Sequence, residues 1–214
     1  MREIILNQIN NALHEHQGFF HSEKEIQIFL AEYFRGSSLY ENVFLEYYVG
    51  INQLPNYPWG NDNKISIDIV LKNENQYYPI EIKFKTATQI LPHFVFDTET
   101  HVTLENHGAQ TIGRYDFWKD IKRLELFEET FENVQRGIML FVSNDPSYRQ
   151  PPRNNDIGGA PFSIYQGRQV NANTFLNWNQ ELSVSNGRPG FLLTHGYMIN
   201  WSPMIIDNHY YILI

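Results

Sequence analysis

Hydrophobic residues have helical spacing in three stretches of the chain and strand-like spacing in several others. Apolar residues recur every three or four positions in an amphipathic helix, whereas a strand alternates apolar and polar residues or, if covered on both faces, stays apolar throughout. On this basis the sequence predicts helices over residues 2–16, 22–34 and 114–132. It also predicts strands over 42–50 and 137–143 and a hairpin within 64–86.

The remaining segments carry weaker patterns. The Pro/Gly/Asn-rich stretch 51–63 is expected to be a loop, and residues 87–113 are expected to be irregular. Residues 144–190 are polar and punctuated by proline and glycine, which predicts a long loop region. Residues 191–214 are expected to form strands that extend the sheet or make a dimer contact.

The hairpin within residues 64–86 contains charged side chains where a half-buried sheet is usually neutral. Period-2 alternation places Glu81 and Lys83 on one face of the second run. In the first run, the same alternation places Asp68 on a face with Ser66 and Val70. The opposite faces are expected to be apolar, with Ile65, Ile67, Ile69 and Leu71 on the first run and Ile80, Ile82 and Phe84 on the second.

The register of this hairpin follows from its polar turn. A turn centred between Glu74 and Asn75 places Asp68 directly opposite Glu81. Directly opposed side chains have Cβ atoms about 4.5–5.5 Å apart, where two like charges are destabilising. Two facing carboxylates with Lys83 two residues on favour a hard cation such as Mg²⁺ or Mn²⁺, which takes oxygen ligands. This pair is the strongest candidate site in the sequence.

Two further carboxylates lie close to predicted buried faces. Ser22 and Glu25 form a capping-box pattern at the start of the second helix. Glu23 borders the apolar face of that helix, where it is either a site carboxylate or a first-turn acid that complements the helix dipole. Glu46, amid the apolar residues of the first strand, is expected to be an exposed strand residue rather than a further site carboxylate.

Asp68 followed by Glu81-Ile82-Lys83 resembles the motif of the PD-(D/E)xK nuclease superfamily, which has the restriction-endonuclease-like fold. Ile67 stands where the motif has its proline, and that position is permissive. The order helix, three strands, helix, strand across residues 22–143 resembles the α-β-β-β-α-β core of these proteins. Much of the chain is also similar to bacterial members of the superfamily whose individual roles are unassigned.

The resemblance implies a single α/β domain over residues 1–214, with a mixed central sheet flanked by helices and a loop-rich extension at 144–214. It implies that Asp68 and Glu81 hold the metal, with the backbone carbonyl of Ile82 as a further ligand. Glu23 is a further catalytic candidate, because these nucleases often place a glutamate on the first core helix. Lys83 would orient or deprotonate the attacking water, or neutralise the charge that builds on the phosphate.

Several residues are candidates for nucleic-acid contact. Gln110 precedes the third helix, and Arg114, Lys119 and Arg123 lie on it, although alternating charges on a helix are more often simply solvated. The loop region 144–190 mixes arginines with aromatic residues, a composition that suits backbone contact and base stacking but also occurs without a ligand. These residues are Arg149, Arg153, Arg168 and Arg188 with Tyr148, Phe162, Tyr165 and Trp178.

Composition narrows the class of protein. At 214 residues, 42% hydrophobic and 15% aromatic, the chain is expected to be globular and to form one sizeable core. It has no cysteine, which excludes disulfides and thiolate metal sites and fits a reducing cytoplasm. Neither a membrane-spanning run nor a signal-peptide pattern is expected. The net charge of −8, without a basic patch, argues against tight non-specific DNA binding by a monomer.

The expected function is therefore a Mg²⁺-dependent or Mn²⁺-dependent nuclease acting on DNA in restriction, repair or defence. The sequence does not separate DNA from RNA as the substrate. A homodimer would allow cutting of both strands. The alternative is a non-catalytic nucleic-acid-binding or assembly module that retains the nuclease fold, which the acidic charge favours.

Overall fold

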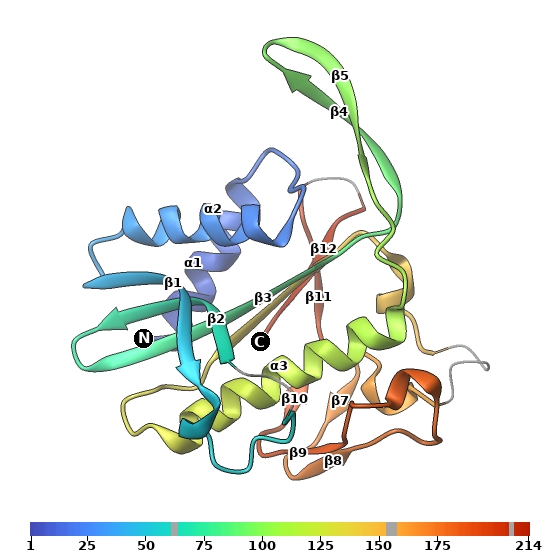
Figure 1. Ribbon diagram of the computed structural model, residues 1–214. Helices are drawn as coiled ribbons and strands as arrows, with labels where there is room; N and C mark the ends of the chain where they lie inside the picture. Colours follow the sequence, from blue (N-terminus) through green and yellow to red (C-terminus); the bar gives the residue numbers. More distant parts are fainter. Residues whose placement is uncertain (61–63, 153–157, 206–207) are drawn as a thin grey trace.

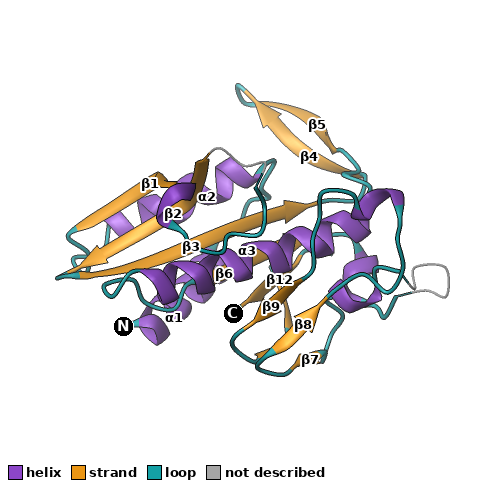
Figure 2. Ribbon diagram, turned by 60° about the horizontal axis from the view of Figure 1, so that its bottom comes forward, coloured by secondary structure: helices purple, strands orange, loops and turns teal. Residues whose placement is uncertain are grey.

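The computed structural model describes residues 1–60, 64–152, 158–205 and 208–214. They form a mixed α/β structure around a six-stranded sheet, whose strands follow the order β1-β2-β3-β6-β12-β11 (Figures 1 and 2). β3 and β6 are parallel and the other neighbours are antiparallel, so the sheet is mixed. The strands are β1 (Asn42–Gly50), β2 (Lys64–Asn73), β3 (Gln76–Lys85), β6 (Ile138–Ser143), β11 (Trp201–Pro203) and β12 (Tyr210–Leu213).

Helices cover both faces of this sheet. α1 (Arg2–Glu15) and α2 (Glu23–Arg35) pack on one face, and α3 (Gln110–Thr130) packs on the other. All three helices were predicted from the apolar spacing. Ser22 caps α2 as predicted, because its Oγ accepts the Glu25 N–H at 3.2 Å. The Glu25 carboxylate, however, accepts the N–H of His21. The element order predicted for residues 22–143 is present, with one hairpin inserted before α3.

The predicted hairpin register is correct up to the candidate site. β2 and β3 pair from Asn73–Gln76 to Ile69–Ile80, which is the register that faces Asp68 toward Glu81. The ladder ends at that last pair, so the two strands separate where the two carboxylates begin. The sheet is therefore open at the position of the motif.

The predicted faces of β2 are wrong, because the alternation changes phase at Asp68. Ile65 and Ile67 belong to the apolar cluster on the α3 side, whereas Ile69 and Leu71 belong to the cluster with α1 and α2. The neighbouring strand is distorted at the same level, where Glu46 adopts a left-handed φ of 50° between Leu45, paired with Ile69, and Tyr47, paired with Ile67. Strict period 2 could not reveal this local switch.

A β-hairpin projects from the body where the sequence suggested irregular structure (Figure 1). β4 (Gln89–Val95) and β5 (Thr98–Leu104) pair along their whole length, and Phe96 at the tip is 97% exposed. The prediction of irregular structure was wrong over residues 89–104, because most side chains of this hairpin are exposed and no buried apolar face marks it in the sequence. Asn144 anchors its base by hydrogen bonds to Ala87 and Gln89.

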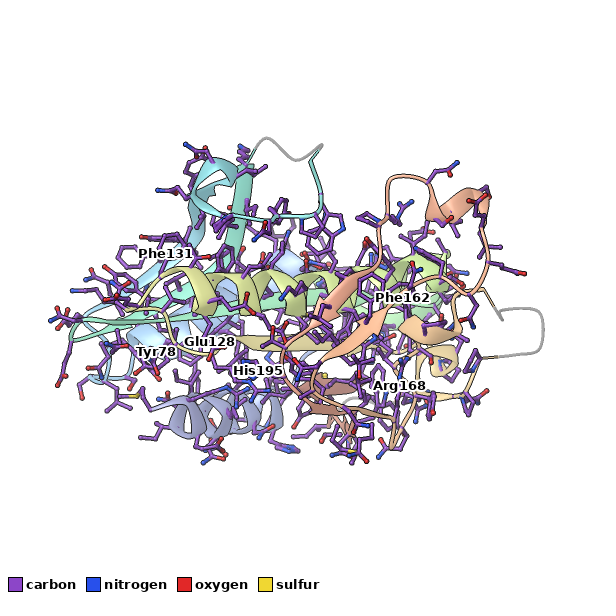
Figure 3. The ribbon with its side chains drawn as sticks, turned by 90° about the horizontal axis from the view of Figure 1, so that it is seen from below. Tyr78, Glu128, Phe131, Phe162, Arg168 and His195 are labelled. Atoms are coloured by element: carbon purple, nitrogen blue, oxygen red, sulfur yellow. The ribbon has the colours of Figure 1, made fainter. Side chains whose placement is uncertain are left out.

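The C-terminal segment spans residues 144–214. In its described part, the stretch 144–190 is more structured than the predicted loop, and residues up to Ile199 cover the side of α3 that faces away from the sheet. Short strands and 3-10 turns follow one another across this segment. Its last two strands join the central sheet, which was one of the two alternatives predicted for residues 191–214. Figure 3 shows His195 of this segment beside Glu128 of α3, with the His195 Nε2 and Glu128 Oε2 atoms 3.0 Å apart. The added strands are β7 (Gln169–Val170), β8 (Thr174–Leu176), β9 (Phe191–Leu193) and β10 (Tyr197–Met198), and the 3-10 turns are η2 (Pro146–Arg149), η3 (Ala160–Phe162) and η4 (Ser183–Ser185), with η1 (Ile51–Gln53) after β1.

This cover and the central sheet together explain why α3 is buried on nearly all sides. Asp120 faces β3, whereas Lys122 and Glu125 face the C-terminal segment, and each is less than a tenth exposed. Glu125 accepts hydrogen bonds from the N–H groups of Thr194 and His195, which tie the C-terminal segment to the helix. None of the helices in the described ranges has the length and apolarity needed to cross a membrane.

Candidate functional site

The candidate site begins where β2 and β3 separate. Oδ2 of Asp68 accepts the backbone N–H of Ile82 at 2.7 Å, just past the last ladder pair. The carboxylate thus takes the place of a strand-to-strand hydrogen bond. The side chain of Glu81, which is 1% exposed, is close enough to Asp68 for each group to affect the pKa of the other. The two acids of the motif are therefore together, as the register predicted.

The acidic and basic side chains of β3 face partners of opposite charge on α3. Arg123 lies 2.6 Å from Glu81 and 2.8 Å from Asp120, measured between guanidinium nitrogen and carboxylate oxygen. Nζ of Lys83 lies 2.8 Å from Oδ2 of the same Asp120. Asp120 thereby joins Arg123 and Lys83 into one buried ionic network between the strand and the helix.

Glu23 reaches this network from the first turn of α2. Its Oε2 accepts the N–H of Phe84 at 3.1 Å, and its Oε1 lies 3.9 Å from Nζ of Lys83. The side chain remains 39% exposed, compared with 18% for Lys83. Glu23 therefore lies at the open side of the site, whereas Glu81 lies at its closed side.

Burial dominates the acid-base properties of the three predicted carboxylates. It raises the pKa of Asp68 and of Glu23, although the charge of Lys83 partly opposes both shifts. It raises the pKa of Glu81 well above its ordinary value, with Arg123 opposing the shift and Asp120 adding to it. A buried carboxyl group in low dielectric favours its neutral form.

Asp120 and Lys83 behave differently because ion pairing outweighs burial. Burial alone would raise the pKa of Asp120, but the charges of Arg123 and Lys83 lower it below the ordinary value. Burial alone would lower the pKa of Lys83, but Asp120, Glu23 and Glu81 raise it. Lys83 is therefore held as a cation, and a protonated amine cannot accept a further proton.

The donor types at this site fit Mg²⁺ or Mn²⁺. At the centre of the described network, four carboxyl groups surround two cations, and this surplus of acid suits a hard divalent cation. As the side chains stand, no three metal-binding residues of the described chain converge tightly enough to hold an ion. Arg123 donates a hydrogen bond to Oε1 of Glu81, and the backbone N–H of Ile82 donates one to Oδ2 of Asp68. Metal binding would compete with the Arg123 contact. The four acids are Glu23, Asp68, Glu81 and Asp120.

The backbone carbonyl of Ile82, expected to be a metal ligand, accepts a hydrogen bond from Nζ of Lys83 at 3.2 Å.

Glu46, expected to be exposed, has a side chain 48% exposed, and it accepts hydrogen bonds from Lys24 and Ser66. It lies on the strand next to Asp68 but outside the ionic network.

Sequence reasoning missed Asp120 and the role of Arg123. A signal was present, because Asp116, Asp120, Arg123 and Phe127 follow the i, i+4, i+7, i+11 spacing of a single helix face. That spacing on a helix shortly after the Glu-x-Lys strand would have indicated a charged face turned inward. Burial raises the pKa of Asp116 as well, with Lys85 and Lys83 partly opposing the shift.

The residues proposed for nucleic-acid contact are mostly turned inward. Arg114 is 5% exposed and donates to the carbonyl of Ser147, and Arg123 belongs to the buried network. Lys119 lies over the ring of Trp59, 5.2 Å from its centroid. Gln110 donates to Asp145 at 3.0 Å. Arg114 and Arg123 therefore do not form an exposed surface on α3 that could contact phosphates, because the C-terminal segment and β3 enclose the helix.

The aromatic and arginine residues of the loop region are also used internally. Tyr148 and Phe162 are buried, so their rings are not open for base stacking. Arg168 donates to backbone carbonyls of Ser163 and Pro161, and Arg188 donates to Val184. The guanidinium of Arg149 stacks 3.5 Å above the ring of Tyr210, Trp178 donates to the carbonyl of Arg188, and Tyr165 is partly buried. Arg153 lies outside the described residues.

Comparison of the chain with protein-family models, with curated proteins and with solved structures finds no match. The fold and the geometry of the site therefore carry the functional argument.

Proposed function

We propose that this protein is a metal-dependent nuclease that hydrolyses DNA phosphodiester bonds, with a restriction-endonuclease-like core. The observation that carries the proposal is the position of Asp68 and Glu81. They meet where β2 and β3 separate, with Lys83 and Glu23 beside them and more carboxyl groups than cations around them. Surplus carboxyl groups at an open point of a sheet are costly to stability, and perturbed titratable groups of this kind cluster at functional sites.

Each residue has a role consistent with its surroundings. Asp68 and Glu81 would hold a Mg²⁺ or Mn²⁺ ion, with Glu23 at the open side as a further ligand or as the residue that positions water. A bound ion of this kind lowers the pKa of its water and stabilises charge on the phosphate. Lys83, kept cationic by Asp120, would neutralise charge that develops on the scissile phosphate.

The test is cleavage of plasmid, linear and single-stranded DNA and of RNA, with Mg²⁺ or Mn²⁺. Wild type is compared with Asp68→Asn, which preserves an acceptor for the Ile82 N–H but removes the charge, and with Lys83→Met. Glu41→Gln is the matched control, since Glu41 pairs with Lys72 on the exposed end of β2. We expect cleavage by wild type and the control, and a loss of at least about 100-fold in the two site variants. Cleavage that survives Asp68→Asn would show that the active site lies elsewhere.

A second candidate is a non-catalytic binding or assembly module with the same fold. It is favoured by the ionic network itself, in which Arg123 pairs with Glu81 and Asp120 pairs with Lys83. The net charge of −8 also favours it. The discriminating measurement is the melting temperature with and without Mg²⁺. A rise that disappears in Asp68→Asn supports the nuclease, and no rise supports the module.

A further inference from the structure

Gln27 of α2 is buried against the strands that carry the candidate site. It is 1% exposed, and its side-chain Nε2 donates to the backbone carbonyl of Asp68 and to Oε1 of Glu46, the latter at 3.0 Å. Burying an amide is costly unless it is hydrogen-bonded, because the group loses its bonds to water. These two contacts therefore make a glutamine acceptable at this position, and they hold its NH₂ group between β1 and β2.

The glutamine amide contacts Asp68 at a gap in the pairing of the strands. Asp68 has no partner in either ladder of β2, all of whose residues the structure describes. The ladder with β1 skips it, and the ladder with β3 ends one residue before it, at Ile69. Backbone groups that lack a regular strand partner are commonly satisfied by a side chain, and the glutamine amide does this for the Asp68 carbonyl.

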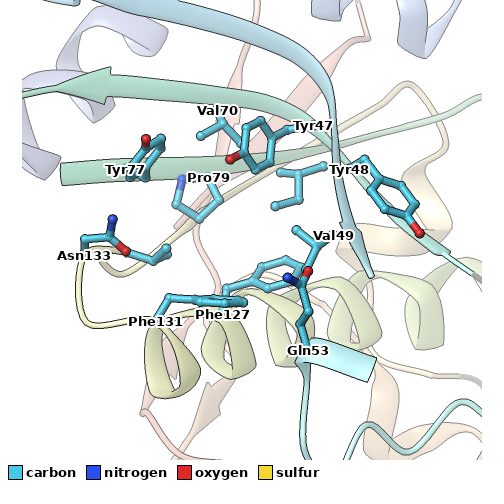
Figure 4. Close-up of a pocket in the computed structure, with 12 residues that line it drawn as sticks. Tyr47, Tyr48, Val49, Gln53, Val70, Tyr77, Pro79, Phe127, Phe131 and Asn133 are labelled. Carbon is cyan, nitrogen blue, oxygen red and sulfur yellow. The ribbon is translucent and has the colours of Figure 1, made fainter. Parts of the chain in front are cut away.

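This gap coincides with a change in the direction of the side chains along β2. Ile67 and Val70 both line a cavity of about 270 Å³ on the α3 side of the sheet (Figure 4). In a regular strand, residues three positions apart point to opposite faces. The direction of the Asp68 side chain, which lies between these two residues, is therefore not determined by strand alternation. It depends on the groups that hold the Asp68 backbone and carboxylate.

α2 holds both strands at the point where they separate. Glu23 and Gln27 are four residues apart, so they lie on the same face of the helix. Glu23 accepts the N–H of Phe84 on β3, whereas Gln27 donates to the carbonyl of Asp68 on β2. The Asp68 carboxylate in turn accepts the N–H of Ile82. Hydrogen bonds that pass through Asp68 thus join the helix to β2 and β2 to β3.

We propose that Gln27 is a positioning residue of the candidate site. By holding the backbone carbonyl of Asp68, its amide keeps the Asp68 carboxylate directed at the Ile82 N–H and beside Glu81. Its consequence for metal binding rests on the proposed function, in which Asp68 is a ligand. Residues that orient a metal ligand typically contribute a factor of about 10–100 to metal affinity. Gln27 would act on the metal only through Asp68.

Amide hydrogen exchange of Ile82, measured by NMR, tests the positioning without metal or substrate. Gln27→Met and Gln27→Leu both keep an apolar side chain in the helix but cannot donate to Asp68, so either variant serves if the other does not fold. Gln8→Met is the matched control, because Gln8 donates to Ser37 outside the site. After correction for global stability by urea denaturation, we expect Ile82 to exchange about tenfold faster in the Gln27 variants than in the control.

Calorimetric titration with Mg²⁺, without substrate, measures the consequence for the site. We expect the Gln27 variants to bind Mg²⁺ about tenfold more weakly than wild type, and Gln8→Met to bind it with unchanged affinity. This difference separates positioning from stability, since the control also loses a side-chain hydrogen bond.

The outcomes distinguish this inference from the nuclease proposal. Unchanged exchange of Ile82 in the Gln27 variants overturns the positioning role, whether or not the protein cleaves DNA. Mg²⁺ binding that is equally tight in wild type and the Gln27 variants also overturns it. Faster exchange of Ile82 in a protein whose wild type binds no Mg²⁺ supports the positioning role and contradicts the nuclease proposal instead.

Discussion

Arg123 contacts Glu81 at 2.6 Å, so the glutamate of the Glu-x-Lys motif is already paired with a cation inside the protein. Both side chains are largely buried, and the same guanidinium contacts Asp120. Breaking a buried pair by removing one partner is strongly destabilising, because the remaining charge is left uncompensated. Arg123 therefore links the stability of the strand–helix interface to the charge state of the candidate site.

Arg123→Met should lower the free energy of unfolding by about 3–5 kcal/mol, measured by urea denaturation at pH 7. Arg123→Lys should have a smaller effect, since an ammonium group keeps the charge but cannot contact two carboxylates in the same bidentate way. Equal losses of unfolding free energy in the two variants would show that the positive charge at this position does not stabilise the fold unless the guanidinium geometry is also present.

The same variant should change the response to metal. Without the Arg123 contact, Glu81 is free to bind a cation, so Mg²⁺ should raise the melting temperature of Arg123→Met more than that of wild type. Differential scanning fluorimetry over a Mg²⁺ titration measures this. The double variant Arg123→Met/Asp68→Asn serves as the control and should lose the extra rise. An identical response in wild type and Arg123→Met would mean that Arg123 and Mg²⁺ do not compete for Glu81.

Asp68→Ala and Asp68→Asn should differ in stability at pH 7. Alanine leaves the buried N–H of Ile82 without its acceptor, which should cost about 1–3 kcal/mol, whereas asparagine can still accept that hydrogen bond. Urea denaturation of both variants against wild type measures the difference. Similar stabilities for the two variants would contradict the bridging role of the Asp68 carboxylate between the strands.

Asp68→Asn should also remove a pH dependence. Because burial raises the pKa of Asp68 in the folded protein, its contribution to stability is fully present below the unfolded pKa and is lost as pH rises through the folded pKa. The stability of Asp68→Asn relative to wild type should therefore increase from pH 4 toward pH 7. A difference that stays constant or falls over this range would show that the pKa is not raised.

Glu125→Ala should release the C-terminal segment from α3. The variant leaves the N–H groups of Thr194 and His195 and the hydroxyl of Tyr197 without their acceptor, and Lys122 loses an ion pair. We expect a loss of about 3–5 kcal/mol and faster limited proteolysis within residues 158–205. Glu125→Gln, which keeps an acceptor, should be less affected, and equal proteolysis of the two variants would contradict this role.

Local pattern was sufficient for much of the architecture. The apolar spacing predicted α1, α2 and α3, and the polar turn at Glu74 and Asn75 predicted the pairing of β2 with β3. Those features depend on side chains a few residues apart, whose period reports which face is buried. The proximity of Asp68 and Glu81 followed from the same register.

The tertiary structure alone decided what those faces meet. The phase switch at Asp68 requires the distorted neighbouring strand at Glu46, and the burial of α3 requires the C-terminal segment that packs over it. The pairing of Arg123 with Glu81 joins residues 42 positions apart. Sequence period determined which residues are near one another within an element. Charge compensation in a buried interface depends on neighbours through space, so only the fold could show which residues Arg123 and Asp120 pair with.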